Sequence, residues 1–294
     1  SQLITIDGKV MAVAFMANTQ HLYVRTDVLK ENGIAIPKTY EDVVAASEKI
    51  RAAGKMKYPY AAAYKAGWNL AEEFVNMYIG HGGEFFESGS AKPSINNAKG
   101  VATLNMLKKL ADLSNPDYLT HDSEAIKVEW EAGNVAIMTL WASRSGTLLD
   151  DEGDAKITAA TKLVAPATVG GGNIPAATLW WDGFTLAKNR SDADAEASFR
   201  AMAHAASSKE MVAKASDQAV WLVEGFVPGP KSVGVIEAVK MGAKPYPMLP
   251  QMGLMHGALG NEIVEFLQGN ETAEQALKDV EAAYNTKAKE QGFL

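Results

Sequence analysis

The chain has 294 residues, of which 47% are hydrophobic and 21% are charged, and its formal net charge is −7. This composition is ordinary for a soluble globular protein, and the length suits two domains. The basic residues are spread mostly singly, which argues against nucleic acid and against an anionic membrane surface as partners. The absence of cysteine excludes disulfides, thiolate metal sites and a cysteine nucleophile. No apolar run approaches the roughly 20 residues of a membrane span, so we expect no direct membrane insertion.

The first part of the chain predicts two strands around a polar break, followed by helices. Residues 10–17 are almost wholly apolar, which predicts a strand covered on both faces. Asn18, Thr19 and Gln20 interrupt this run, and residues 21–25 resume an extended pattern. Thr39 and Asp42 stand at the spacing of a capping box, which predicts a helix that begins there and ends near Gly54.

The remaining chain alternates between helical and extended patterns. Further helices are predicted over 68–79, after a cap at Asn97, after a cap at Asp122 or Ser123, over 261–267 and after Thr272, and further strands over 58–65, 135–141, 162–167, 179–187 and 221–227. Ser191 and Asp194 begin another helix, which is predicted to bury Phe199 and Met202. This alternation predicts an α/β fold.

The motifs of common catalytic sites are missing. The sequence has no G-x-S-x-G elbow, no H-E-x-x-H pair and no phosphate-binding G-x-x-x-x-G-K-[ST] loop. The five histidines lack metal-ligand spacing, so we expect no metal and no cofactor. Paired carboxylates could still form a glycosidase. The alternative function is therefore a carbohydrate-acting enzyme that uses Asp182 and a second acid such as Glu224.

The N-terminal run resembles a known family. The run contains, in this order, DGK, an apolar strand, ANT, an extended segment, TDVLKENGI and PKTYEDVV. It resembles the extracellular solute-binding proteins of ABC importers, of the maltose-binding type. The resemblance implies a periplasmic-binding-protein type II-like fold of two lobes, without catalysis. It also implies a monomer that captures a small carbohydrate or polyol and delivers it to an ABC transporter permease. The implied location is the periplasm, or outside the cell with a lipid anchor on the parent protein.

The same resemblance implies how the chain is divided. Family members carry a substantial stretch before this run, so we expect a fragment whose first lobe is incomplete. Residues 1–17 and 176–227 are predicted to be the remnant of the N-terminal lobe, and 18–175 with 228–294 the C-terminal lobe. The crossings are placed at the ANT break, at a run of three glycines and at a pair of prolines. A third possibility is a lobe kept for interaction alone, without a ligand.

Aromatic residues supply the stronger signal for a sugar site. Sugars have an apolar C–H face and a ring of hydroxyls, so their sites need flat aromatic platforms beside planar polar groups. Trp180 and Trp141 are candidates at strand positions. Trp68 begins a helix just after Tyr64, where the family often has a cleft aromatic, and a place in the core is an equal alternative for Trp68.

Four polar residues complete the predicted site. Asn18 is implied to lie at a hinge strand beside the ligand. Arg144 aligns with an aromatic residue of maltose-binding members, which suggests bidentate hydrogen bonding instead, and a surface arginine is the alternative. Asp182 is an acid in an otherwise apolar strand, costly to bury unless it is partnered. His256 aligns with a family segment that borders the ligand, although the methionines beside it favour packing.

Overall fold

The computed structural model describes residues 3–6, 8–150, 153–207 and 209–294. Two β-sheets organise the chain, and helices alternate with their strands along the sequence, in agreement with the predicted α/β class. The first sheet contains β1 (Leu3–Ile6), β2 (Lys9–Asn18), β7 (Thr178–Phe184) and β9 (Lys244–Pro245) in that order, with β8 (Val220–Trp221) also paired to β2. The second sheet has the order β4 (Tyr60–Ala61), β5 (Ile137–Trp141), β3 (Gln20–Arg25), β6 (Thr161–Val164).

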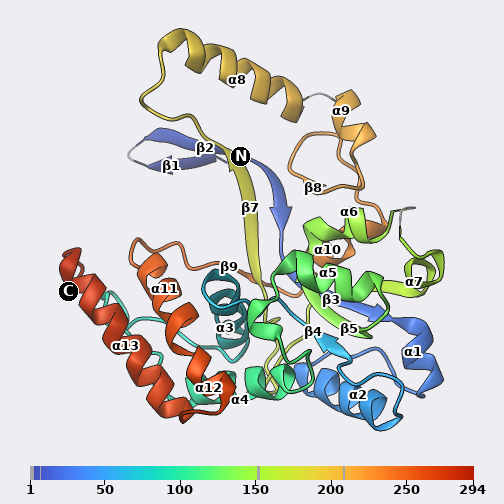
Figure 1. Ribbon diagram of the computed structural model, residues 1–294. Coiled ribbons are helices and arrows are strands. Elements are labelled where there is room, and N and C mark those ends of the chain that lie inside the picture. Colours follow the sequence, from blue (N-terminus) through green and yellow to red (C-terminus); the bar gives the residue numbers. More distant parts are fainter. Residues whose placement is uncertain (1–2, 7, 151–152, 208) are drawn as a thin grey trace.

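Helices surround the second sheet and extend beyond the first (Figure 1). They are α1 (Thr26–Glu31), α2 (Tyr40–Ala52), α3 (Trp68–Gly80), α4 (Ala98–Ala111), α5 (Ser123–Glu131), α6 (Ser145–Leu148), α7 (Ala155–Ala160), α8 (Asp192–Ser207), α9 (Lys209–Lys214), α10 (Val233–Lys240), α11 (Met252–Glu262), α12 (Val264–Gln268) and α13 (Ala273–Glu290). Short 3₁₀ turns lie at Tyr118–Thr120, Ala142–Arg144 and Pro230–Ser232.

Capping side chains fix the helix starts where the sequence predicts them. The Thr39 hydroxyl accepts the Asp42 N–H at 3.0 Å, and the Asp42 carboxylate accepts the Thr39 N–H at 3.1 Å. This reciprocal pair is the predicted capping box, and it satisfies donors that the helix itself leaves free. The Asn97 side chain caps α4 as predicted, and of the two candidates for α5 it is Asp122 that caps it; each side chain accepts two backbone N–H groups without a reciprocal bond.

The chain passes from one sheet to the other between β2 and β3. Asn18 ends β2 in the first sheet and Gln20 begins β3 in the second, which leaves Thr19 as the junction. The Thr19 hydroxyl donates to the Thr178 carbonyl at 2.8 Å, so this crossing is tied to the first residue of β7. At the same end of β7, Lys244 of β9 pairs with Thr178. The division into lobes at 17/18, 175/176 and 227/228 stays a prediction.

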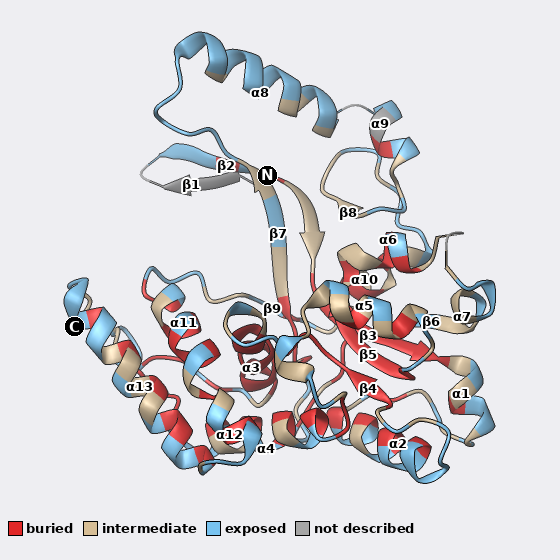
Figure 2. Ribbon diagram, in the orientation of Figure 1, coloured by how far each residue is buried: buried red, intermediate tan, exposed pale blue. Residues whose placement is uncertain are grey.

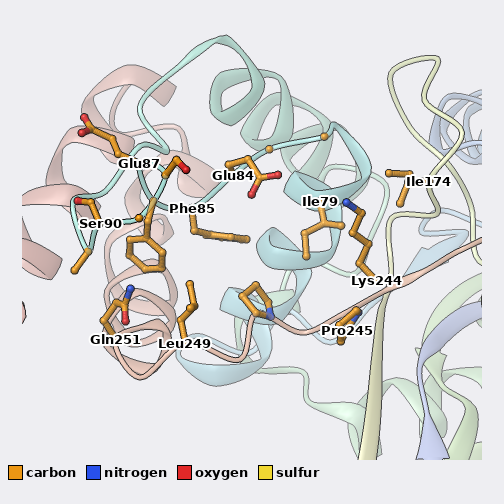
Figure 3. Close-up of a pocket in the computed structure, with 17 residues that line it drawn as sticks. Ile79, Glu84, Phe85, Glu87, Ser90, Ile174, Lys244, Pro245, Leu249 and Gln251 are labelled. Carbon is orange, nitrogen blue, oxygen red and sulfur yellow. The ribbon is translucent and has the colours of Figure 1, made fainter.

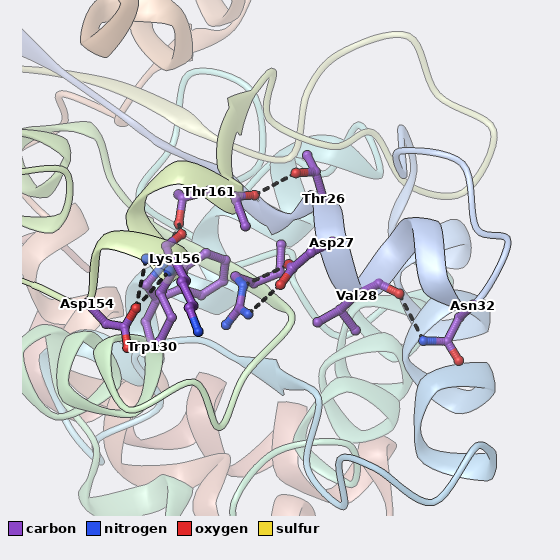
Figure 4. A network of polar contacts seen from close by, with 11 residues as sticks. Thr26, Asp27, Val28, Asn32, Trp130, Asp154, Lys156 and Thr161 are labelled. Atoms are coloured by element: carbon purple, nitrogen blue, oxygen red, sulfur yellow. Dashed lines mark hydrogen bonds and ion pairs between the residues drawn. The ribbon is translucent and has the colours of Figure 1, made fainter.

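A network of polar contacts joins three helices to one end of the second sheet (Figure 4). The Arg25 guanidinium donates twice to Asp27, at 3.0 and 2.7 Å, and holds the pKa of that carboxyl below its usual value. The Thr26 hydroxyl donates to the Ala160 carbonyl at 2.8 Å. The indole of Trp130, which is fully buried, donates to Thr161 at 3.2 Å. These bonds hold α1, α5 and α7 onto the edge of the sheet.

The buried side chains concentrate in the second sheet and in α3, whereas α8 is mostly exposed (Figure 2). Two expectations were therefore wrong. β2 is not covered on both faces, because Val10, Met11 and Val13 are exposed, and α8 does not bury Phe199, which is 51% exposed. The physical reason is an open groove of about 360 Å³ between α8 and the strands β2 and β7. The apolar side chains line this groove without packing across it.

Candidate functional site

Five rings from distant parts of the chain form one aromatic cluster, which we define as Trp68, Trp141, Trp180, Tyr246 and His256. The Trp68 ring centroid lies 6.2 Å from that of Trp141 and 5.9 Å from that of Trp180, and the latter two lie 6.0 Å apart. Tyr246 lies 4.5 Å from Trp180, and His256 lies 5.1 Å from Trp68. The cluster therefore brings together four parts of the fold: the start of α3, the end of β5, the strand β7 and the residues from β9 into α11.

The cluster keeps part of its apolar surface accessible. Trp68 is 50% exposed, Trp141, Trp180 and Tyr246 are half-buried, and only His256 is buried. A contiguous group of partly exposed indoles is unusual on a protein surface, which makes it a candidate interaction site. Because each ring has a flat apolar face and a polar N–H edge, the group suits a ligand that has both kinds of surface.

Hydrogen bonds fix the histidine side of the cluster. His256 Nε2 lies 3.0 Å from the Trp68 carbonyl oxygen, and its Nδ1 lies 2.9 Å from the Tyr246 hydroxyl. A carbonyl only accepts, so Nε2 carries the proton and Nδ1 accepts from Tyr246. Burial lowers the pKa of His256, which favours this neutral ring. His256 thus connects Tyr246 to the first residue of α3.

Behind Trp180 lies a buried polar network that connects α3 to both strands at the crossing. The Trp180 indole N–H is shared between Glu72 Oε1 at 3.1 Å and the Thr178 hydroxyl at 2.8 Å. That hydroxyl lies 2.7 Å from Glu72 Oε1 and 2.7 Å from the Asn76 amide oxygen. Asn76 in turn donates to Gln20 at 3.1 Å, and Gln20 donates to Glu73 at 2.9 Å.

Burial dominates the electrostatics of this network. Desolvation raises the pKa of Glu72 and of Glu73 to about 8, because both carboxyls are removed from water and, among the described residues, neither faces a cation that would favour its charged form. The sequence reasoning missed Glu72, Glu73 and Asn76. Two adjacent acids and an amide within the otherwise apolar run LAEEFVNMYIG were the signal that could have identified them.

The structure brings four of the eight predicted site residues into the cluster: Trp68, Trp141, Trp180 and His256. Asp182 is exposed and follows Trp180 on the same face of β7, and partial burial raises the pKa of its carboxyl. The side chain of Asn18 is hydrogen-bonded within the protein. Its amide oxygen accepts the Ser143 N–H at 3.1 Å, and its amide nitrogen donates to the Ser143 hydroxyl at 3.2 Å.

The other two predicted residues have structural partners. Arg144 forms an ion pair with Glu124 on α5. Tyr64 is fully buried and contacts Tyr118 edge-on, at a centroid distance of 6.0 Å. Neither ring nor guanidinium belongs to the aromatic cluster. Their roles in ligand binding stay predictions.

A separate cavity of about 580 Å³ lies between the loop that follows α3 and the segment before α11 (Figure 3). Phe85, Pro245, Pro247 and Leu249 line it, with Glu84 and Lys244 among its polar residues. Tyr246, between the two prolines, belongs to the aromatic cluster instead. None of the eight residues predicted from sequence lines this cavity.

The described residues also bear on other kinds of site. Within the described ranges, no group of three or more histidine, cysteine or acidic side chains is placed to hold a metal ion. In that same part of the chain, every helix is too short or too polar to span a bilayer.

Comparison with protein families gives one match that covers most of the chain. Residues 1–245 match the family described as bacterial extracellular solute-binding protein. A curated relative, a probable ABC transporter-binding protein of Deinococcus radiodurans, is 31% identical over 193 residues. That alignment covers 63% of this chain and 44% of the relative, so the matched part spans less than half of the relative's length.

Solved structures show the same fold. Maltose-bound T. maritima MalE3 superposes with a TM-score of 0.82 at 20% identity, over 97% of this chain and 76% of that one. A solute-binding protein of Agrobacterium vitis S4 with bound D-mannitol gives 0.79 at 18% identity, over 98% and 75% of the two chains. A protein of Agrobacterium radiobacter K84 in complex with ribitol gives 0.80 at 18% identity, over 97% and 73%. The predicted periplasmic-binding-protein type II fold is thereby confirmed.

Proposed function

The chain belongs to the bacterial extracellular solute-binding proteins, and on this premise we propose that it binds a small carbohydrate or polyol at the aromatic cluster. The observation that carries the proposal is the convergence of Trp68, Trp141 and Trp180 with part of each ring accessible. Covering about 50–100 Å² of a sugar's apolar face would contribute roughly 1–2.5 kcal/mol. Three proteins with this fold are known with maltose, D-mannitol or ribitol bound, which supports this class of solute.

The proposed mechanism is closure of two lobes over the solute. The lobes are residues 1–17 with 176–227 and residues 18–175 with 228–294, and they move about the crossing at Thr19. Contacts that exist only in the closed form shift the population toward it. In this proposal Asp182 and Arg144 supply hydrogen bonds to hydroxyls, and Asn18 holds the hinge strand beside them. The closed protein then delivers its solute, without chemical change, to the permease of an ABC importer.

Membership of the family supports the partners and the location that we propose. The curated relative is described as an ABC transporter-binding protein, which supports a membrane permease as the partner. We propose that the protein works as a monomer in the periplasm, or outside the cell with a lipid anchor.

A thermal-shift screen against sugars and polyols tests the proposal. A solute at a hundredfold excess over its dissociation constant should stabilise the fold by about 2.7 kcal/mol. For a chain of 294 residues that corresponds to a rise of roughly 4 °C in melting temperature. Asp182→Ala should remove much of the shift, whereas Asp192→Ala, on the exposed start of α8, should leave the shift unchanged. Absence of any shift across the panel would contradict the proposal.

The alternative enzyme needs two carboxyls that act on one bond. Burial raises the pKa of Asp182, as a general acid requires. In the part of the chain that the structure describes, no hydrogen bond joins Asp182 to Glu224. Hydrolysis of a nitrophenyl glycoside by the wild-type protein, lost in Asp182→Asn, would favour the enzyme over the transport protein.

A further inference from the structure

Glu72 is a buried acid in direct contact with a ring of the proposed solute site. Its Oε1 lies 3.1 Å from the Trp180 indole nitrogen and 2.7 Å from the Thr178 hydroxyl. Its Oε2 is also buried and has no hydrogen-bond partner among the described residues. A carboxylate in this position would leave a charged oxygen unsatisfied, whereas a neutral carboxylic acid carries a smaller penalty.

We propose that Glu72 is a proton-linked positioning residue, which holds the Trp180 indole in the aromatic cluster and whose neutral form is the one that binds solute. The effect on affinity rests on the proposed function. The hold on Trp180 does not, because it is present in the protein without solute.

The hydrogen-bond geometry accommodates both charge states of Glu72. When Glu72 is neutral, its O–H can donate to the Thr178 hydroxyl, which then donates to the Asn76 amide oxygen 2.7 Å away. When Glu72 is ionised, the Thr178 hydroxyl turns to donate to the carboxylate, and Asn76 keeps the Thr178 N–H at 2.7 Å. In both states the indole N–H of Trp180 points at Glu72, and the bond is stronger to the ionised acceptor.

Solute binding should discriminate between these two states. A sugar or polyol that covers Trp180 removes water from the region next to Glu72, which makes the charged form of the carboxyl costlier. By linkage, the solute binds the neutral form more tightly and raises the pKa of Glu72 further. Affinity should therefore fall as the pH rises through the titration of Glu72, for which burial places the pKa at about 8.

The other titratable groups around Glu72 can be told apart from it. Glu73 is its neighbour on α3, Asp182 lies further along β7, Tyr246 interacts with it from the segment before α11, and His256 of α11 is bonded to Tyr246. Burial lowers the pKa of His256 below 6.5 and raises that of Tyr246 above 10, so neither is expected to titrate between pH 6.5 and 9. Glu73 shares the high pKa but donates and accepts nothing at Trp180, since its partner is Gln20.

The direct test follows the Trp180 indole N–H by NMR in the solute-free protein labelled with ¹⁵N-tryptophan. Trp180→Phe assigns the resonance. We expect its proton to shift downfield between pH 6.5 and 9 with a single midpoint near 8, because the acceptor becomes charged. In Glu72→Gln, whose amide oxygen still accepts the N–H, the resonance should remain in place and stop titrating.

Glu73→Gln is the matched control, since it makes the same change at an equally buried neighbour. The Trp180 resonance should still titrate in Glu73→Gln, with a midpoint close to that of the wild type, because burial is the main cause of the raised pKa of Glu72 and Glu73 is bonded to Gln20 instead of Trp180. A resonance that does not titrate in the wild type, or that titrates equally in Glu72→Gln, would overturn the positioning role.

A second measurement tests the effect on affinity, with D-mannitol and maltose as probes. The wild type should bind several-fold more weakly at pH 9 than at pH 6.5, and Glu72→Gln should bind equally at both. Equal pH dependence in the two proteins would overturn the linkage. Failure of the wild type to bind either probe at any pH would count against the proposed function instead, while the NMR result decides the role of Glu72.

Discussion

Helices α3 and α8 both have an apolar face, but only the face of α3 is covered by neighbouring elements. The face of α8, which projects beside β2, is left open. In α3, the predicted inward residues Leu70, Phe74 and Val75 are fully buried against neighbouring helices. In α8, Phe199 stands at a comparable helical spacing but lines an open groove. Periodicity thus identifies the side of a helix that is apolar, whereas only the tertiary structure identifies what covers it.

The largest expected effect is the difference in stability lost when a phenylalanine is replaced by alanine in α3 and in α8. Phe74→Ala should destabilise the protein by about 3–5 kcal/mol, because it leaves a cavity among close-packed neighbours. Phe199→Ala, at 51% exposure, should cost less than about 1 kcal/mol. Urea unfolding of the two variants measures both values. Equal losses would mean that the groove beside α8 is closed in solution.

Two glycines on α11 allow a closely packed position to be compared with an open position within one helix. A Cβ on Gly260 would lie 2.1 Å from the Gly67 carbonyl oxygen, so Gly260→Ala must push α11 away from the start of α3. We expect a loss of about 1–3 kcal/mol. A Cβ on Gly257 meets nothing within 4 Å, and Gly257→Ala should stabilise the helix by up to about 1 kcal/mol. Melting temperatures that move in the same direction would contradict this packing.

The buried acids of α3 should give stability a distinctive pH dependence. Their folded-state pKa of about 8 exceeds the usual 4.5, so their contribution is full below pH 4.5 and is lost as the pH rises to about 8. Buried histidines such as His21, whose pKa falls to about 4, act oppositely, but only below pH 6.5. Between pH 6.5 and 8, unfolding free energy should therefore fall by up to about 1.4 kcal/mol per pH unit for each carboxyl.

Denaturant titrations at several pH values across this window measure the slope. The double substitution Glu72→Gln, Glu73→Gln should flatten it, since neither amide titrates. A slope that persists in the double variant would assign the dependence to other groups.

More of the fold than of the candidate site could be predicted from the sequence. Caps and periodicity located α2, α3 and α4, because these signals are local. Trp68, Trp141, Trp180 and His256 were chosen for their residue types and the family resemblance, and the structure places their rings together. Tyr246 was missed because a proline-rich segment carries no periodicity, and Glu72 was missed because its partners, Thr178 and Trp180, lie more than a hundred residues away.

The most direct test of the central claim, that the aromatic cluster binds the solute, compares two tryptophans by isothermal titration with the best sugar or polyol of the panel. Trp68 belongs to the cluster and is 50% exposed, whereas Trp181 is 36% exposed and lies on the opposite face of β7 from Trp180. Trp68→Ala should weaken binding by about 5- to 70-fold, which corresponds to the loss of roughly 1–2.5 kcal/mol of stacking. Trp181→Ala should leave affinity unchanged. Equal losses in the two variants, or a loss in Trp181→Ala alone, would contradict the account.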